Sequence, residues 1–184
     1  MNVYFTASLA AKQQYIQNYQ QIVETLKKQQ CAIIADHILG ETESSIKLQT
    51  REERLQFHKQ LEDWINDCDC VVVEASFPSI SVGYEISMAL HRGKPVLVLY
   101  SEGDPPSLLA YHADEKIVCE RYTRETLGDL ISEFISFVKG SSDSRFTFFI
   151  TPKIAAYLEQ KAKSEKLPKS VYLRKLIEKD MSKI

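Results

Sequence analysis

Residues 69–86 read DCVVVEASFPSISVGYEI, and this stretch decides the fold class. The run Cys70–Ala75 is apolar almost throughout, which is typical of a strand buried on both faces of a sheet. A turn at Phe77-Pro78 follows, and a helical pattern then extends from about Val82 to Arg92 and stops at Gly93. A buried strand that turns directly into a helix is the building unit of an α/β protein.

The rest of the first 140 residues repeats this alternation. Short runs rich in Val, Ile, Leu and Tyr predict four more strands, at Asn2–Thr6, Ala32–Ala35, Pro95–Tyr100 and Lys116–Cys119. Helical stripes lie between them: one carries Tyr15 to Leu26, one opens at the capping-box sequence Thr50-Arg-Glu-Glu53, and the last runs from Thr123 to Gly140. The alternation predicts a parallel sheet with helices on both faces.

Composition bounds the function classes. The chain has 184 residues, 44% of them apolar, and a net charge of −2, which excludes a disordered, collagen-like or disulfide-stapled protein. No apolar run approaches the roughly 18 residues of a membrane span, and no basic stretch precedes the first strand as in a secretory signal. The four cysteines have no metal-site spacing. We therefore expect a cytoplasmic protein with no metal and no cofactor.

Charge divides the chain into two parts. Residues 1–144 carry a net charge of −8, whereas residues 145–184 carry +6. The polar sequence Gly140-Ser-Ser-Asp-Ser144 lies at the boundary. We predict an enzyme-like domain over residues 1–140, a linker over 141–144 and a small basic unit over 145–184.

The basic unit reads as strand, helix, helix. Phe146, Phe148 and Ile150 alternate with other residues and give the strand one apolar face. Thr151-Pro152 then starts one helix, and Leu167-Pro168-Lys169-Ser170 interrupts the pattern before a second one. About 40 residues cannot bury a core alone, so this unit needs a partner chain.

The chemistry is expected near Glu85. The chain has neither GxGxxG nor a Walker A sequence. We expect Glu85 in the first turn of its helix, where the helix dipole favours an ionised carboxylate. In a doubly wound sheet this loop lies at the carboxyl edge of the strands, where ligands bind, and Thr6-Ala7-Ser8 flanks the same crevice.

Three segments carry a family resemblance: YFTASL at residues 4–9, WINDCDCVVVEASFPSISVGYEI at 64–86 and KPVLVLY at 94–100. They resemble the nucleoside 2-deoxyribosyltransferase family, and in particular its branch of 2′-deoxynucleoside 5′-monophosphate N-glycosidases. The resemblance spans roughly residues 1–139. It implies a flavodoxin-like five-stranded sheet, a homodimer or higher oligomer, and cleavage of the bond between base and deoxyribose through a covalent enzyme intermediate.

The resemblance also implies site residues. The family's nucleophile falls on Glu85, and its hydroxyl-orienting tyrosine falls on Tyr4. The serine that contacts the substrate phosphate falls on Ser79, and Ser107 is the nearest match to a phosphate-contacting serine from a neighbouring subunit. The expected substrate, a deoxynucleoside or deoxynucleotide, is also contacted by three flanking residues, Ser8, Ser81 and Gly83.

This chain departs from the family where the leaving base needs a proton. The family's aspartate, three residues before the aromatic that matches Trp64, falls on Leu61. His58 lies one helical turn before Leu61 on the same face and is the better substitute acid. The family's basic residue after its first serine is also absent, with Ala10 or Ala11 at that place.

Structural roles compete with these assignments. Glu85 could simply contact the helix dipole, and Tyr4 could fill space in its strand. Ser79 and Ser81 could only cap the helix. His37 follows the second strand, where it could reach the crevice or belong to a solvated loop.

The basic unit resembles ribbon-helix-helix domains, in which strands of two chains pair and enter the major groove of DNA. The outward side chains would be Arg145, Thr147 and Phe149, and the start of the second helix at Lys169-Ser170 could hold a phosphate. The alternative is a dimerisation unit that binds no DNA.

Three functions follow from the sequence. The first is an enzyme that cleaves N-glycosidic bonds of deoxynucleosides or their 5′-monophosphates. The second is a catalytically impaired, ligand-sensing regulator that binds double-stranded DNA through its tail. The third is a nucleotide-binding protein whose tail only assembles it.

Overall fold

The computed structural model describes residues 1–42, 50–103, 106, 109, 116–140, 150–165 and 169–181. The chain divides into two compact units, Met1–Ser144 and Arg145–Ile184. Each unit is described by itself.

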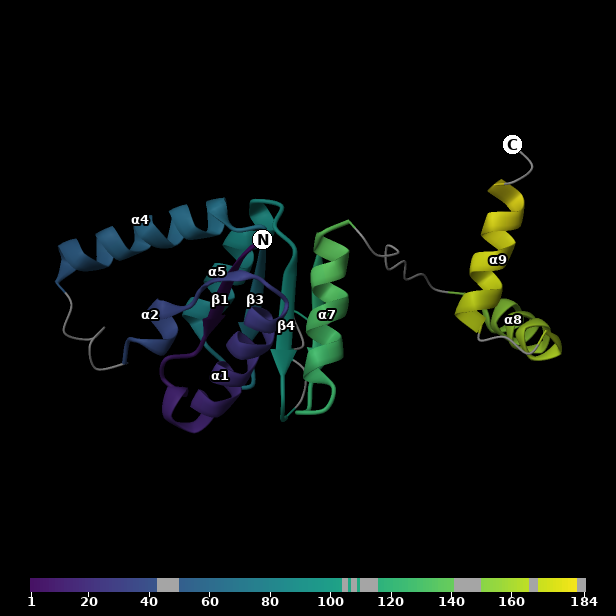
Figure 1. Ribbon diagram of the computed structural model, residues 1–184, viewed down its shortest axis with the longest axis horizontal. Coiled ribbons are helices and arrows are strands. Elements are labelled where there is room, and N and C mark those ends of the chain that lie inside the picture. The colour runs from purple at the N-terminus through teal and green to yellow at the C-terminus, as the bar shows by residue number, and fades with distance from the viewer. Residues whose placement is uncertain are drawn as a thin grey trace. The chain divides into compact units, whose positions relative to one another are not determined.

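The first unit is built on a five-stranded parallel sheet (Figure 1). Its strands are β1 (Asn2–Ala7), β2 (Ala32–Ile34), β3 (Cys70–Glu74), β4 (Val96–Tyr100) and β5 (Ile117–Arg121), in the spatial order β2-β1-β3-β4-β5. Strand β3 is buried along its whole length, whereas the edge strands β2 and β5 are partly exposed. This arrangement confirms the predicted flavodoxin-like α/β fold. The prediction succeeded because continuous apolar runs are typical of strands covered on both faces.

Two helical layers cover the sheet. Helices α1 (Lys12–Lys28) and α7 (Leu127–Val138) pack on one face, against Val3, Phe5 and Val72. Helices α4 (Arg51–Asp67) and α5 (Ile80–His91) pack on the other, against Tyr4 and Val71. A four-residue helix α2 (Asp36–Leu39), which the periodicity did not predict, follows β2. Alternate residues of each strand therefore serve separate cores.

Helix starts follow the predicted capping chemistry with one correction. The Thr50 hydroxyl accepts a bond from the Glu53 amide at 3.2 Å, and the Glu53 carboxylate accepts from the Thr50 amide at 2.6 Å, which completes the expected capping box. Helix α5 starts two residues before Val82, because Ser79 occupies its N-cap and accepts from the Val82 amide at 3.4 Å. Glu85 consequently lies in the second turn, so the expectation of a first-turn carboxylate is wrong.

Helix α4 is longer than the sheet that it covers. Its 17 residues span about 26 Å, whereas a five-residue strand spans about 17 Å. The amino-terminal half therefore extends past the sheet, and residues 51–60 are exposed apart from the half-buried Phe57 (Figure 1). His58 lies on this half.

The second unit contains two helices, α8 (Pro152–Ser164) and α9 (Lys169–Met181), which pack against each other. Thr151 caps α8 as predicted, and its hydroxyl accepts from the Ile154 amide at 3.4 Å. Among the described residues of this unit, Ala162 and Tyr172 are buried hydrophobics. The predicted strand at residues 145–149 lies outside the described residues.

Candidate active site

Tyr4 and Glu85 meet between the sheet and α5. Tyr4 lies on β1 and faces this layer. Its hydroxyl donates to Glu85 Oε2 at 3.0 Å. The two residues are 81 positions apart in the sequence, and parallel pairing of β1 with β3 brings the start of α5 beside β1. The side chain of Glu85 is only 8% exposed. The pair proposed from the family resemblance thus forms a buried carboxylate with one hydrogen-bonded oxygen.

Burial controls the protonation of this pair. It raises the pKa of Glu85, and the Thr6 and Tyr4 hydroxyls lower it in opposition. Burial and the neighbouring Glu85 charge raise the pKa of Tyr4, so its hydroxyl stays protonated and remains a donor. A buried carboxylate whose one oxygen accepts from the Tyr4 hydroxyl has a second oxygen left for chemistry, and the nucleophilic role of Glu85 stays a prediction.

An aromatic wall stands beside the pair, and the sequence identified it only in part. The His37 ring stacks on Tyr4 with centroids 4.9 Å apart and planes 10° apart, and Trp64 lies 5.0 Å from His37. Phe57 packs edge-on to Trp64. His37 is 7% exposed, so the alternative of a solvated loop histidine is wrong.

The ring nitrogens of His37 are both buried without a hydrogen-bond partner among the described residues. Burial lowers the pKa of His37 to about 4, against the opposing charge of Asp36. The imidazole is therefore neutral at pH 7 and offers one donor and one acceptor. Both nitrogens are enclosed by the protein, so the imidazole acts here as a buried, neutral aromatic ring.

The position of the family's missing acid and its proposed substitute have different surroundings. Leu61 is 5% exposed and fills the core between α4 and the sheet, together with Ile65 and Val82. His58 is exposed, and its Nε2 lies 3.0 Å from the hydroxyl of Tyr84. Its predicted helical face is shared with Leu61, but at this point α4 has already passed the sheet. The role of His58 as an acid stays a prediction.

The expected substrate-binding residues occupy different settings. Ser79 caps α5, while Ser81 and Gly83 are exposed on its first turn. Ser8 is buried and its carbonyl accepts from the Tyr19 hydroxyl at 2.9 Å. Ser107 lies outside the described residues.

The structure describes none of the side chains assigned to DNA contact. Arg145, Thr147 and Phe149 lie outside the described residues, and so do the side chains of Lys169 and Ser170 at the start of α9. Across the described ranges, no group of three or more His, Cys, Asp or Glu side chains is placed to hold a metal ion. No helix in the described part of the chain has the length and apolar character needed to cross a membrane.

Comparison with known proteins points to one family. The model of the family described as nucleoside 2-deoxyribosyltransferase matches residues 3–133. The 5-hydroxymethyl-dUMP N-hydrolase of Tetraodon nigroviridis is 28% identical over 144 residues, which cover 74% of this chain and 98% of that protein. A putative 2′-deoxynucleoside 5′-phosphate N-hydrolase 1 of Methanococcoides burtonii is 29% identical over 101 residues, covering 54% of this chain and 80% of that protein.

A solved structure supports the fold independently. The CMP N-glycosidase BcmB of Clostridium botulinum superposes with a TM-score of 0.54 at 17% identity, over 72% of this chain and 99% of that one. At that identity the likeness concerns the sheet and its helices. The family match, in turn, ends before the basic unit.

Proposed function

The chain belongs to the nucleoside 2-deoxyribosyltransferase family, and from that premise we propose that it hydrolyses the N-glycosidic bond of 2′-deoxynucleoside 5′-monophosphates. The observation that carries the proposal is the hydrogen bond between Tyr4 and the buried Glu85. Hydrolysis is preferred to transfer because the relatives described above are named as N-hydrolases.

Glu85 is the proposed nucleophile. Tyr4 occupies Oε2, so Oε1 is the oxygen left to attack C1′ of the deoxyribose. As the bond from C1′ to the base nitrogen breaks, the base leaves with the electron pair and the anomeric carbon gains oxocarbenium character, which the carboxylate stabilises. Glu85 and C1′ then form an ester. Water then attacks C1′ and breaks the ester, and the proton that it loses neutralises the departed base through solvent, so that deoxyribose 5-phosphate, free base and the carboxylate result.

The proposed base site is the wall of His37 and Trp64. A pyrimidine or purine stacks on aromatic rings, and Trp64 is the half-buried member of this pair, whereas His37 supports it from within the protein.

The proposed phosphate site is the start of α5. Backbone amides at a helix amino terminus attract phosphate, and the Ser79 hydroxyl stands at this cap. Ser8 directly follows the strand that carries Tyr4, at the carboxyl edge of the sheet. Ser107 completes the proposal as a contribution from a second subunit, as the family resemblance implies.

A second copy of the chain is the proposed partner on this face. Ile80 is 95% exposed, and Phe77, Tyr84 and Leu55 are exposed large hydrophobics on or near α5 and the overhanging part of α4. Exposed apolar side chains gathered beside a site favour a protein interface. Such an interface would bring a neighbouring subunit to the phosphate site.

The basic unit is proposed to strengthen that assembly. Its described helices expose Ile154 and Tyr157 on α8, and Leu176, Ile177 and Met181 on α9. A unit of this size gains stability by covering such residues with a second copy. DNA binding by the unit stays a prediction from its positive charge.

Chromatography of free bases tests the proposed activity. The full chain is incubated with the four common 2′-deoxynucleoside 5′-monophosphates, with a 5-hydroxymethylpyrimidine analogue, and with the corresponding nucleosides. We expect free base and deoxyribose 5-phosphate from at least one monophosphate, and slower release from its nucleoside. Release from nucleosides only, or transfer of the sugar to an added base without hydrolysis, would contradict the proposal.

A further inference from the structure

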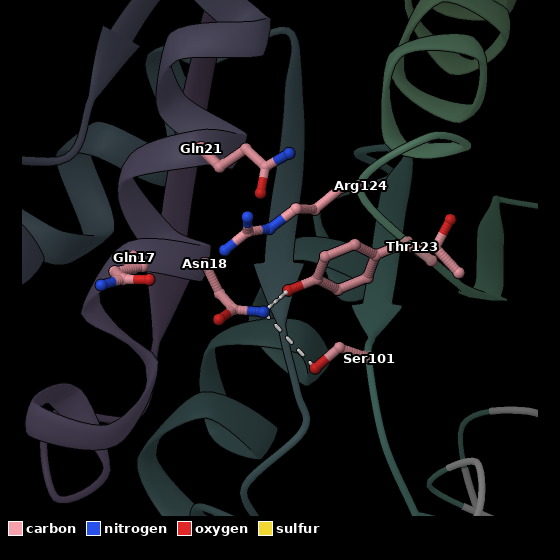
Figure 2. A pocket seen from close by; sticks show the side chains of 7 residues that line it. Gln17, Asn18, Gln21, Ser101, Thr123 and Arg124 are labelled. Carbon is pink, nitrogen blue, oxygen red and sulfur yellow. Dashed lines mark hydrogen bonds between the residues drawn. The ribbon is translucent and has the colours of Figure 1, made fainter.

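A second candidate site lies in a pocket on the face of the sheet that α1 and α7 cover, opposite the layer that holds Glu85. It encloses about 250 Å³. Its lining comes from three side chains of α1 and from the segments that follow β4 and β5: Gln17, Asn18, Gln21, Ser101, Tyr122, Thr123 and Arg124 (Figure 2). Like the candidate active site, it lies where parallel strands end, the edge at which α/β sheets bind ligands.

The floor of the pocket is held by hydrogen bonds. Asn18 Nδ2 donates to the Tyr122 hydroxyl at 2.7 Å and to Ser101 Oγ at 3.5 Å (Figure 2). Tyr122 in turn donates to Glu74 Oε1 at 3.3 Å, and Ser76 donates to the same oxygen. Glu74 is 1% exposed. These hydrogen bonds hold the polar side chains of the floor in place before a ligand binds. Binding therefore costs little conformational entropy at the floor.

The upper wall has polar groups that remain available. Figure 2 shows the Arg124 guanidinium reaching toward α1, between the side chains of Gln21 and Asn18. Within the described ranges, the side chains of Gln17, Gln21 and Arg124 have no hydrogen-bond partner, and the charge of Arg124 acts on the neighbouring Glu125 without a salt bridge. Three donors therefore line a cavity in whose floor Asn18 and Tyr122 already have hydrogen-bond partners.

The charge of the pocket lining favours an anionic ligand. The lining holds one guanidinium and no carboxylate, although residues 1–144 carry a net charge of −8. Arg binds phosphate through paired N–H groups, and neutral amides and hydroxyls can complete the shell of such an anion or bind sugar hydroxyls. A cavity of about 250 Å³ is smaller than the usual range for drug-sized ligands, which favours a small metabolite.

We propose that this pocket binds a small sugar phosphate, with Arg124 and Gln21 on the phosphate and Asn18, Ser101 and Tyr122 facing the sugar. The site is separate from the one that holds Glu85, because the sheet lies between α5 and the helices α1 and α7. It therefore does not depend on the proposed glycosidase activity.

Side-chain NMR signals test the proposal at the site itself. The ¹⁵N-labelled full chain is titrated with ribose 5-phosphate, which has no base to release, and separately with inorganic phosphate and with ribose. We expect ribose 5-phosphate to shift the side-chain amide signals of Asn18 and Gln21 and the Nε–H signal of Arg124. Arg124→Ala should weaken the affinity at least tenfold, as measured on the two amide signals.

Arg121→Ala is the matched control. It removes the same charge from an exposed residue three positions earlier, on the edge strand and outside the pocket lining. We expect it to keep the wild-type affinity. Equal weakening in both variants, shifts with ribose but not with ribose 5-phosphate, or unchanged Asn18 and Gln21 signals at millimolar ligand would overturn the proposal.

Discussion

Tyr4→Phe removes one oxygen from the candidate site and keeps the ring that stacks on His37. The lost hydroxyl donates to Glu85 at 3.0 Å and lowers the pKa of that buried carboxyl. A hydrogen bond to a charged group contributes about 1.5–3 kcal/mol. Its removal should therefore raise the pKa of Glu85 further, because burial is then opposed by one hydroxyl fewer.

The consequence is read from the pH dependence of base release. A nucleophilic carboxylate must be ionised, so the acidic limb of kcat/KM should move to higher pH by the same amount as the pKa of Glu85. ¹³C NMR of the labelled Glu85 carboxyl measures the shift directly and does not require turnover. Tyr84→Phe is the control, because Tyr84 is the sequence neighbour of Glu85 yet bonds His58. An unmoved limb and an unmoved carboxyl signal in Tyr4→Phe would refute the reasoning.

Three further outcomes are expected. Because the pKa of His37 falls from an ordinary 6.5 to about 4 on folding, the unfolded chain binds more protons between those values, and stability is lost as pH falls. From pH 7 to pH 4.5, urea unfolding should show wild type losing about 2–3 kcal/mol more than His37→Phe, and equal losses would contradict the burial. Leu61→Asp should reduce the free energy of unfolding by about 3 kcal/mol, because a carboxyl replaces a buried core residue; an unchanged urea midpoint would show that this position is open. Leu176→Glu and Ile177→Glu, both exposed on α9, should reduce the particle mass in light scattering, and an unchanged mass would exclude this face from assembly.

The fold was readable because its strands and helices have different periods. The Val run of β3 and the capping box of α4 are local signals, and the structure has both where the sequence predicts them. Boundaries were less certain. Ser79 and Ser81 were both possible caps, and only the hydrogen bond from the Val82 amide shows that Ser79 is the one.

The candidate site was predicted unevenly. Tyr4 and Glu85 were proposed together from the family resemblance, and their hydrogen bond could not have been derived from spacing alone. His37 was ambiguous because it follows an edge strand, and only the tertiary stack with Tyr4 and Trp64 removes it from solvent. His58 shares a helical face with Leu61, but periodicity does not reveal where a helix outruns its sheet.

The second candidate site gave no recognisable signal in the sequence. Gln17, Asn18 and Gln21 form a polar stripe, which on most helices is a solvated face. Arg124 lies far away in the chain, in the segment before α7. Their convergence depends on the packing of α1 beside α7, which is a property of the folded unit.

Base release by a matched pair of variants tests the central claim most directly. Glu85→Gln and Glu74→Gln each neutralise a buried carboxylate on opposite layers of the same sheet, and the pKa of each group is raised by burial. With the monophosphate that wild type cleaves fastest, Glu85→Gln should lower kcat at least a hundredfold, while Glu74→Gln should stay within about tenfold of wild type. Wild-type turnover by a folded Glu85→Gln protein would contradict the account.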